Sequence, residues 1–199
     1  MNPTKLMAVA LCATAFVTTT AFADDDFGIE SASPVTIADP VNPQPGMVLS
    51  GYKGQRTVNR DWLKDSITTL PKAPAIKSVI DKSEAFSLTA LGNTESNVGM
   101  WIGFLKCKRA GLYTLTLTGG RTIHDGYSLR VNGRSVIVAG KAQTSADAAF
   151  KVGWNKIELV CQFGRGTLSV VYKPKESLSD ARPLTPAMLF HDQKPEEDW

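Results

Sequence analysis

Apolar and polar side chains alternate over short stretches of the chain, most clearly after residue 98. In residues 111–118, Tyr113, Leu115 and Leu117 point to one side, while threonines dominate the other. A period of two residues is typical of a strand with one buried face. Residues 156–163 alternate in the same way. Five further segments are candidate strands: 85–90, 99–106, 127–131, 134–139 and 166–172.

Turn residues separate these candidate strands. Asn132-Gly133 lies between two apolar runs, and this pair favours a type I′ hairpin turn because both central residues need a positive φ. Residues 61–67 form either one short helix or a turn, and no long helical pattern is found. About seven short strands joined by such turns predict an all-β fold, namely a single antiparallel β-sandwich of the jelly-roll or a related type.

The N-terminus has the pattern of a signal peptide. Lys5 precedes an apolar run over residues 6–17, and Ala21-Phe22-Ala23 is the small-x-small pattern that signal peptidase cleaves. The run is shorter than the roughly 20 apolar residues that span a bilayer. We therefore expect cleavage after Ala23, no transmembrane segment in the mature chain, and a periplasmic or secreted protein.

The mature chain divides into three parts by composition. Residues 24–46 contain four prolines and few large apolar side chains, so they predict a disordered linker. Residues 47–176 hold the candidate strands and form the predicted sandwich. Residues 177–199 form an irregular tail, in which the apolar segment 183–190 is expected to pack on the sandwich and the acidic segment 194–199 to fray.

The net charge and the cysteine content restrict the possible classes of protein further. Cleavage removes Lys5 and no acid, which leaves 21 of the 22 basic residues against 19 acidic ones. This near balance excludes the basic footprint of a nucleic-acid-binding protein. Cys12 leaves with the signal peptide, and Cys107 and Cys161 share the inward phase of their strands. In an oxidising compartment the two predict one disulfide, joining either two facing sheets or two neighbouring strands.

Catalytic groups are sparse. His124 and His191 are the two histidines, and neither has the partners of a catalytic triad or a zinc site. Glu158 faces outward on its strand and Glu95 lies in a polar loop, positions that are typical of solvated acids rather than of a glycosidase pair. We expect no enzyme, no metal site and no cofactor.

Four short motifs occur in a recognisable order. Gly51-Tyr52-Lys53-Gly54 comes first, followed by Gly111-Leu112-Tyr113-Thr114-Leu115, His124-Asp125-Gly126, and a segment that ends in Ile157-Glu158-Leu159. This order resembles the lectin-like β-sandwich domain family named after anthrax protective antigen. That family typically has a Gly-x-Tyr-x-Phe strand, an Asp-Asp-Gly loop and a Gly-x-x-x-Ile-x-Ile strand. The resemblance covers about residues 47–173.

The resemblance implies a ligand site in the loop 119–127. Members of the family often bind glycans, and in yeast flocculins two adjacent aspartates hold a calcium ion that ligates sugar hydroxyls. His124-Asp125 matches that pair, so one carboxylate is missing from a calcium site that needs six to eight oxygen ligands. Calcium is possible as a cofactor but is not expected. The residues implied as ligand-binding are Arg121, His124, Asp125 and Tyr127.

A plainer interpretation of the same loop stays open. Asp125 before Gly126 is a common way to cap a turn, so the loop can be a simple strand connection. Two functions follow from the whole sequence. The first is an exported, non-catalytic binding module that recognises a glycan or a cell-surface component. The alternative is a structural or accessory subunit of an envelope or surface protein assembly, which binds protein instead of sugar.

Overall fold

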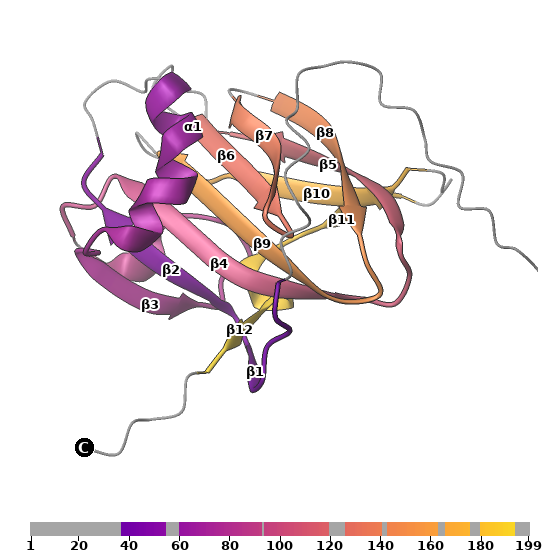
Figure 1. The fold of residues 1–199 in the computed structure, drawn as a ribbon. Coiled ribbons are helices and arrows are strands. Elements are labelled where there is room, and N and C mark those ends of the chain that lie inside the picture. The colour runs from indigo at the N-terminus through magenta and orange to yellow at the C-terminus, as the bar shows by residue number, and fades with distance from the viewer. Residues whose placement is uncertain are drawn as a thin grey trace, which may run out of the picture. The chain divides into compact units, whose positions relative to one another are not determined.

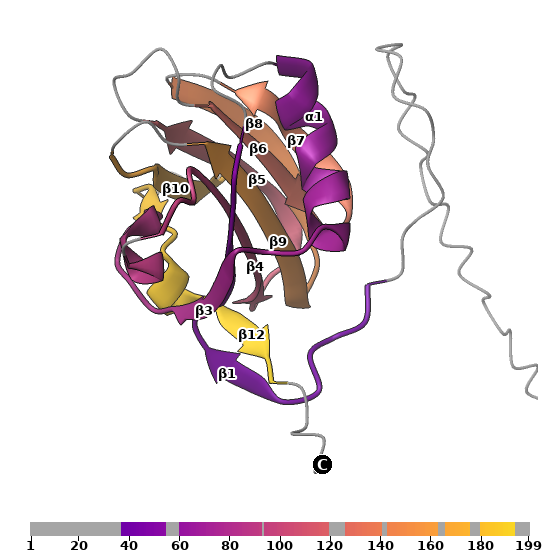
Figure 2. The ribbon, with the colours of Figure 1, turned by 90° about the vertical axis from the view of Figure 1, so that its left-hand side faces the viewer.

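The computed structural model describes residues 37–54, 60–92, 94–119, 126–140, 143–162, 166–175 and 180–193, all within one compact unit, Val35–Trp199. These residues form two facing antiparallel sheets (Figures 1 and 2). The predicted β-sandwich is therefore confirmed. The large sheet contains, in order, β1 (Pro43–Pro45), β12 (Phe190–Asp192), β4 (Val98–Cys107), β9 (Gly153–Gln162), β6 (Gly126–Val131) and β7 (Arg134–Gly140), and β2 (Met47–Tyr52) joins β4 to β3 (Lys77–Asp81).

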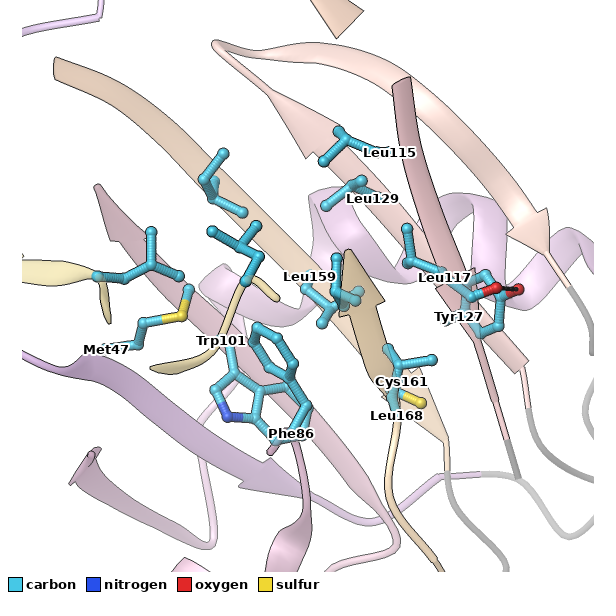
Figure 3. Close-up of a cluster of buried hydrophobic side chains, with 14 of the residues drawn as sticks. Met47, Phe86, Trp101, Leu115, Leu117, Tyr127, Leu129, Leu159, Cys161 and Leu168 are labelled. Carbon is cyan, nitrogen blue, oxygen red and sulfur yellow. Dashed lines mark hydrogen bonds between the residues drawn. The ribbon is translucent and has the colours of Figure 1, made fainter. Parts of the chain in front are cut away.

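The small sheet has the order β11 (Arg182–Pro183), β10 (Ser169–Pro174), β5 (Gly111–Thr118) and β8 (Gln143–Phe150). Its inward side chains meet those of the large sheet in the main core (Figure 3). The ring of Trp101 on β4 lies 5.6 Å from that of Phe86 in an edge-on contact. Leu115 and Leu117 of β5 are fully buried, as the alternation in residues 111–118 predicts.

A helix covers part of the outer face of the large sheet. α1 (Arg60–Thr69) packs on β6, β7 and β9, which decides the helix-or-turn alternative in favour of a helix (Figure 2). Its Leu63 and Ile67 join a second apolar cluster with Val160 of β9. β9 is consequently buried on both faces. The prediction that Glu158 faces solvent is wrong: it is 6% exposed and forms ion pairs with Arg130 and Lys156.

The predicted hairpin is confirmed, whereas one predicted strand is not. Asn132 and Gly133 have φ values of 51° and 76° between β6 and β7, as a type I′ turn requires. Residues 85–90 do not form a strand. Ser87 caps a 3-10 helix, η2 (Leu88–Leu91), by accepting a bond from Thr89 N at 3.2 Å, and a serine in this position competes with strand pairing.

The predicted disulfide is wrong. Cys107 pairs with Gly153 and Cys161 pairs with Gly99, at opposite ends of the same β4–β9 ladder. Eight residues on β4 separate the two positions, which is roughly 26 Å at about 3.3 Å per residue. A disulfide requires Cα atoms less than about 7 Å apart. Both sulfurs face the main core, so the predicted inward direction of the two side chains is confirmed. The alternation of apolar residues does not reveal the register of β4 against β9, and it therefore could not show that the two cysteines lie far apart.

The ordered structure extends past the predicted boundaries of residues 47 and 176. β1 lies in the segment predicted as a linker, and it pairs with β12 from the predicted tail. β11, also in that tail, pairs with β10. Non-local pairing thus forms strands in the described parts of both segments, residues 37–46 and 180–193. No described helix has the length and apolar character needed to cross a membrane.

Candidate functional site

The loop predicted to bind ligand connects the two sheets. It leaves β5 of the small sheet after Thr118 and enters β6 of the large sheet at Gly126. Arg121, His124 and Asp125 lie outside the described residues. The described residues therefore locate the two ends of this loop, one on each sheet at the same end of the sandwich.

Several other connections begin or end beside this loop. In the large sheet, Gln162 at the end of β9 pairs with both Gly126 and Val98, the first residues of β6 and β4. In the small sheet, Thr118 pairs with Ser169 and Gln143, the first residues of β10 and β8. We call the part of the sandwich marked by these six residues the loop end. Loops gathered at one end of a rigid sandwich are a common place for a ligand site.

Tyr127 does not line the surface of the loop end. Its side chain is 1% exposed, and its hydroxyl donates a hydrogen bond to Leu117 O at 3.0 Å (Figure 3). Burial raises the pKa of Tyr127, so the hydroxyl stays protonated and acts as this donor. Gly140 leaves room for the ring, since a Cβ there would lie 2.5 Å from Tyr127 Cε2. The ring of Tyr127, which the resemblance implies as ligand-binding, thus offers no surface to a ligand.

An asparagine at the loop end was missed by sequence reasoning. Asn97 Oδ1 accepts a bond from Gly54 N at 2.5 Å, and Asn97 N donates to Tyr52 O at 3.1 Å. Together these bonds hold the end of β2 against the start of β4. No local sequence signal indicates this contact, because the partner of the Asn97 amide oxygen, Gly54, lies 43 residues earlier in the chain.

Gly54 is needed for this close approach. A Cβ at Gly54 would lie 2.3 Å from Val98 Cγ2 and 3.2 Å from Gln162 Oε1. Gln162 is 3% exposed, so the base of the loop end is tightly packed and contains two carboxamides. Lys53 and Glu95 form a neighbouring ion pair at 3.2 Å, but both are largely exposed and the pair contributes little. Amides and carboxylates are the groups that recognise hydroxyl-rich ligands.

The described carboxylates Glu84, Glu95 and Glu158 are not gathered at one place, and Asp125 lies outside the described residues. Glu158 lies beneath α1 on β9, Glu95 lies near the loop end beside Lys53, and Glu84 accepts a bond from Thr185. Each is engaged by a different partner. Among the described residues, no group of three or more His, Cys, Asp or Glu side chains is placed to hold a metal ion.

An open groove of about 450 Å³ lies away from the loop end, where β1 and β12 meet the end of β3. Its lining is mixed: Gln44, Val48, Ile80, Lys82, His191, Asp192 and Gln193. His191 is half-buried on β12, and its Nδ1 has no hydrogen-bond partner among the described residues. Asp192 is the one carboxylate of this lining, and its Oδ1 accepts bonds from the backbone of Val41 and Asn42. The described residues that line the groove therefore include no acid pair of the glycosidase kind.

Comparison with solved structures shows the fold. The PA14 domain of the MpAFP antifreeze protein matches with a TM-score of 0.52 at 16% identity, over 81% of this chain and 98% of that one. The chain shares its fold with that PA14 domain. An anti-sigma factor domain-containing protein also matches with a TM-score of 0.52 at 16% identity, over 81% of this chain; the chain spans about half of that structure, 51%.

A PA14 sugar-binding domain from an RTX adhesin matches with a TM-score of 0.48 at 13% identity, over 70% of this chain and 95% of that domain. No family model and no curated protein matches the sequence.

Proposed function

We propose that this protein is an exported, non-catalytic module of the PA14 type that binds a glycan or another cell-surface component at its loop end. The observation that carries this proposal is the shared fold with a PA14 domain over 98% of that domain's length. The sequence motifs that resemble the same family also support it: one lies on β5, one ends on β9, and one falls in the loop that joins β5 to β6.

Residues of the loop have distinct roles in this proposal. Asp125 accepts protons from sugar hydroxyls, and Arg121 donates hydrogen bonds to ring or hydroxyl oxygens. His124 supplies a further donor or acceptor beside Asp125. Tyr127 takes no part in ligand contact, because its ring is in the core; it holds the start of β6 in place below the loop.

A glycan array probed with the mature protein tests this function. We expect a restricted set of glycans to bind, and Asp125→Ala to weaken binding at least about ten-fold, the loss expected when a charged acceptor is removed from a polar site. Asp65→Ala is the matched control, since Asp65 is exposed on α1, and it should bind like the parent. Equal binding by the Asp125→Ala variant would contradict the placement of the site.

A blank array favours the second function from the sequence, an accessory subunit of an envelope assembly. In that case an envelope protein should co-purify with the parent chain in stoichiometric amount.

Binding in this proposal does not depend on calcium, because His124 replaces one of the two carboxylates. The array pattern should be the same with and without a chelator. Calorimetry should detect no calcium binding below millimolar concentration, the weak end of protein calcium sites. Micromolar calcium binding that Asp125→Ala abolishes would contradict this and would mean that backbone carbonyls replace the missing carboxylate.

Export is part of the same proposal. The mass of the protein recovered from the periplasm or the medium should correspond to cleavage after Ala23, leaving 176 of the 199 residues. Recovery of the uncleaved chain from the cytoplasm would contradict it.

A further inference from the structure

Five edge strands bound the two sheets in the described part of the chain: β1, β3, β7, β8 and β11. Exposed edges can pair with strands of other molecules, so proteins usually protect them. β1 carries Pro43 and Pro45, and β11 has two residues, one of them Pro183. β3 is short and packs against η2. β7 is bulged against β6 and has Ala139 at a φ of 54°. Each of these four edges is poorly suited to further pairing.

β8 has none of these protections. It runs over eight residues with the sequence Gln-Thr-Ser-Ala-Asp-Ala-Ala-Phe, and all eight pair with β5. It contains no proline, glycine, lysine or arginine, and none of its residues has a positive φ. Asp147 is its one charge, and it points to the outer face, where it binds Thr114 and Lys175. β8 is therefore a long, regular edge that is not blocked by charge.

The side chains of β8 are compatible with a second copy of the same strand. Inward residues must pair with inward residues across an antiparallel ladder. When Ala146 lies opposite Ala146 of the second copy, Thr144 faces Ala148 of that copy and Ser145 faces its Asp147. Residues 143–149 then overlap without any contact between like charges. A register centred on Asp147 would instead place two carboxylates opposite each other, which is destabilising.

We propose that two copies of this protein associate through β8, antiparallel, with Ala146 on the two-fold axis. The four strands of each small sheet then form one continuous sheet across the dimer. The two edges are self-complementary. The Ser145 hydroxyl of each copy faces the Asp147 carboxylate of the other copy, so this cross-strand pair occurs twice by symmetry. The small side chains on β8 allow the two backbones to approach along the whole overlap.

Sedimentation of the full mature chain over micromolar to millimolar concentration tests the dimer. Ser145→Asp places a carboxylate opposite Asp147 of the second copy, and Ser145→Lys places an ammonium there. We expect Ser145→Asp to weaken dimerisation roughly five-fold and Ser145→Lys to strengthen it by a similar factor, since two cross-strand charge pairs change in each dimer. The same two substitutions at Ser169, exposed on β10 away from this edge, are the controls and should leave dimerisation unchanged.

Ser145 bonds to Thr116 at 2.8 Å, so circular dichroism and thermal midpoints should confirm that each variant is folded. Hydrogen exchange is an independent measurement: amides of β8 should become more protected as protein concentration rises. A monomer at every concentration would overturn the proposal. A dimer whose affinity does not change with the charge at residue 145 would also overturn it. So would a monomer whose β8 amides are protected only when an extended peptide of another protein is added.

Discussion

At the scale of single residues, one buried carboxylate fixes the position of the main aromatic pair. Asp81 is 1% exposed; its Oδ2 accepts a bond from Trp101 Nε1 at 2.7 Å, and its Oδ1 accepts bonds from both the backbone and the hydroxyl of Ser83. The carboxylate thus ties the end of β3 to the centre of β4. Burying a carboxyl group in this way is tolerated because each oxygen is hydrogen-bonded.

Replacing this carboxylate should be costly. Asp81→Ala removes the acceptor of the Trp101 indole bond and of both Ser83 bonds, and we expect a loss of about 3 kcal/mol in the free energy of unfolding. Urea denaturation followed by tryptophan fluorescence measures it. Asp65→Ala, which removes an exposed carboxylate, should change stability by less than about 0.5 kcal/mol. Equal effects of the two changes would show that the buried bonds do not stabilise the fold.

The two core-facing cysteines should differ in reactivity. Burial raises the pKa of the Cys107 thiol, and a bond to Asn155 offsets this in part. Alkylation requires the thiolate, so the reaction of Cys107 should be slow at neutral pH and should reach half its maximal rate at a pH above the ordinary thiol value. Cys161 is fully buried and should react after unfolding.

Mass spectrometry of the alkylated protein at a series of pH values measures both reactions. A reducing agent added beforehand should leave the pattern unchanged, because the two thiols are far apart on the ladder. A protein that becomes alkylatable only after reduction would contradict the register of β4 and β9.

Tyr127 illustrates how far a residue can be predicted from the sequence. The motif match placed it in a ligand loop, whereas its alternation with Leu129 and Val131 already indicated an inward position. Alternation was the better guide because it reflects burial directly. The roles of Arg121, His124 and Asp125 stay predictions.

At the scale of elements, strands with strong alternation were predictable and those with small side chains were not. β5 and β6 carry large apolar residues at every second position, and the turn after β6 requires positive φ. β8 was missed because alanine, serine and threonine dominate it, so its inward positions differ little from its outward ones in hydrophobicity. Its partner β5 orders it through the ladder, which is a tertiary effect that local propensity does not report.

α1 should depend on its contact with the sheet for stability, since a ten-residue helix is marginal by itself. Leu63 is fully buried in the second cluster, and Leu63→Ala should lower the free energy of unfolding by about 3 kcal/mol. Leu112→Ala is the matched control, because Leu112 is 51% exposed on β5, and it should cost less than about 1 kcal/mol. Chemical denaturation measures both; similar values would mean that α1 is not held by its apolar face.

At the scale of the whole molecule, the sandwich separates its surfaces by role. The loop end carries the sheet-to-sheet connections, while the edge strand β8 runs along the side of the small sheet. In an antiparallel pair of β8 strands, the loop ends of the two copies would point in opposite directions. The proposed dimer thus leaves the proposed ligand loops free, and the two proposals can be tested separately.

The terminal strands β1 and β12 pair with each other at one edge of the large sheet, and no sequence pattern predicts this pairing. β1 and β12 are about 150 residues apart in the chain and three residues long, so neither shows a periodicity. Backbone bonds add to the ladder: Gly46 N donates to Leu189 O at 2.7 Å, and Gln193 N donates to Asn42 O at 3.1 Å. Phe190 of β12 also packs edge-on against Trp154, with ring centroids 5.3 Å apart.

These contacts predict where the stable domain begins. Digestion of the mature chain by a broad-specificity protease should leave a fragment that starts before Val41, because Val41 N and Asn42 N both donate to Asp192 Oδ1. A chain shortened to begin at Met47 loses β1 and these bonds, and we expect it to be about 3 kcal/mol less stable than one that begins at residue 37, at roughly 1 kcal/mol net for each of several backbone bonds. N-terminal sequencing of the fragment and urea denaturation of the two shortened chains measure this. A fragment that begins at Met47 with undiminished stability would show that β1 is an accessory of the sandwich and that the domain starts at β2.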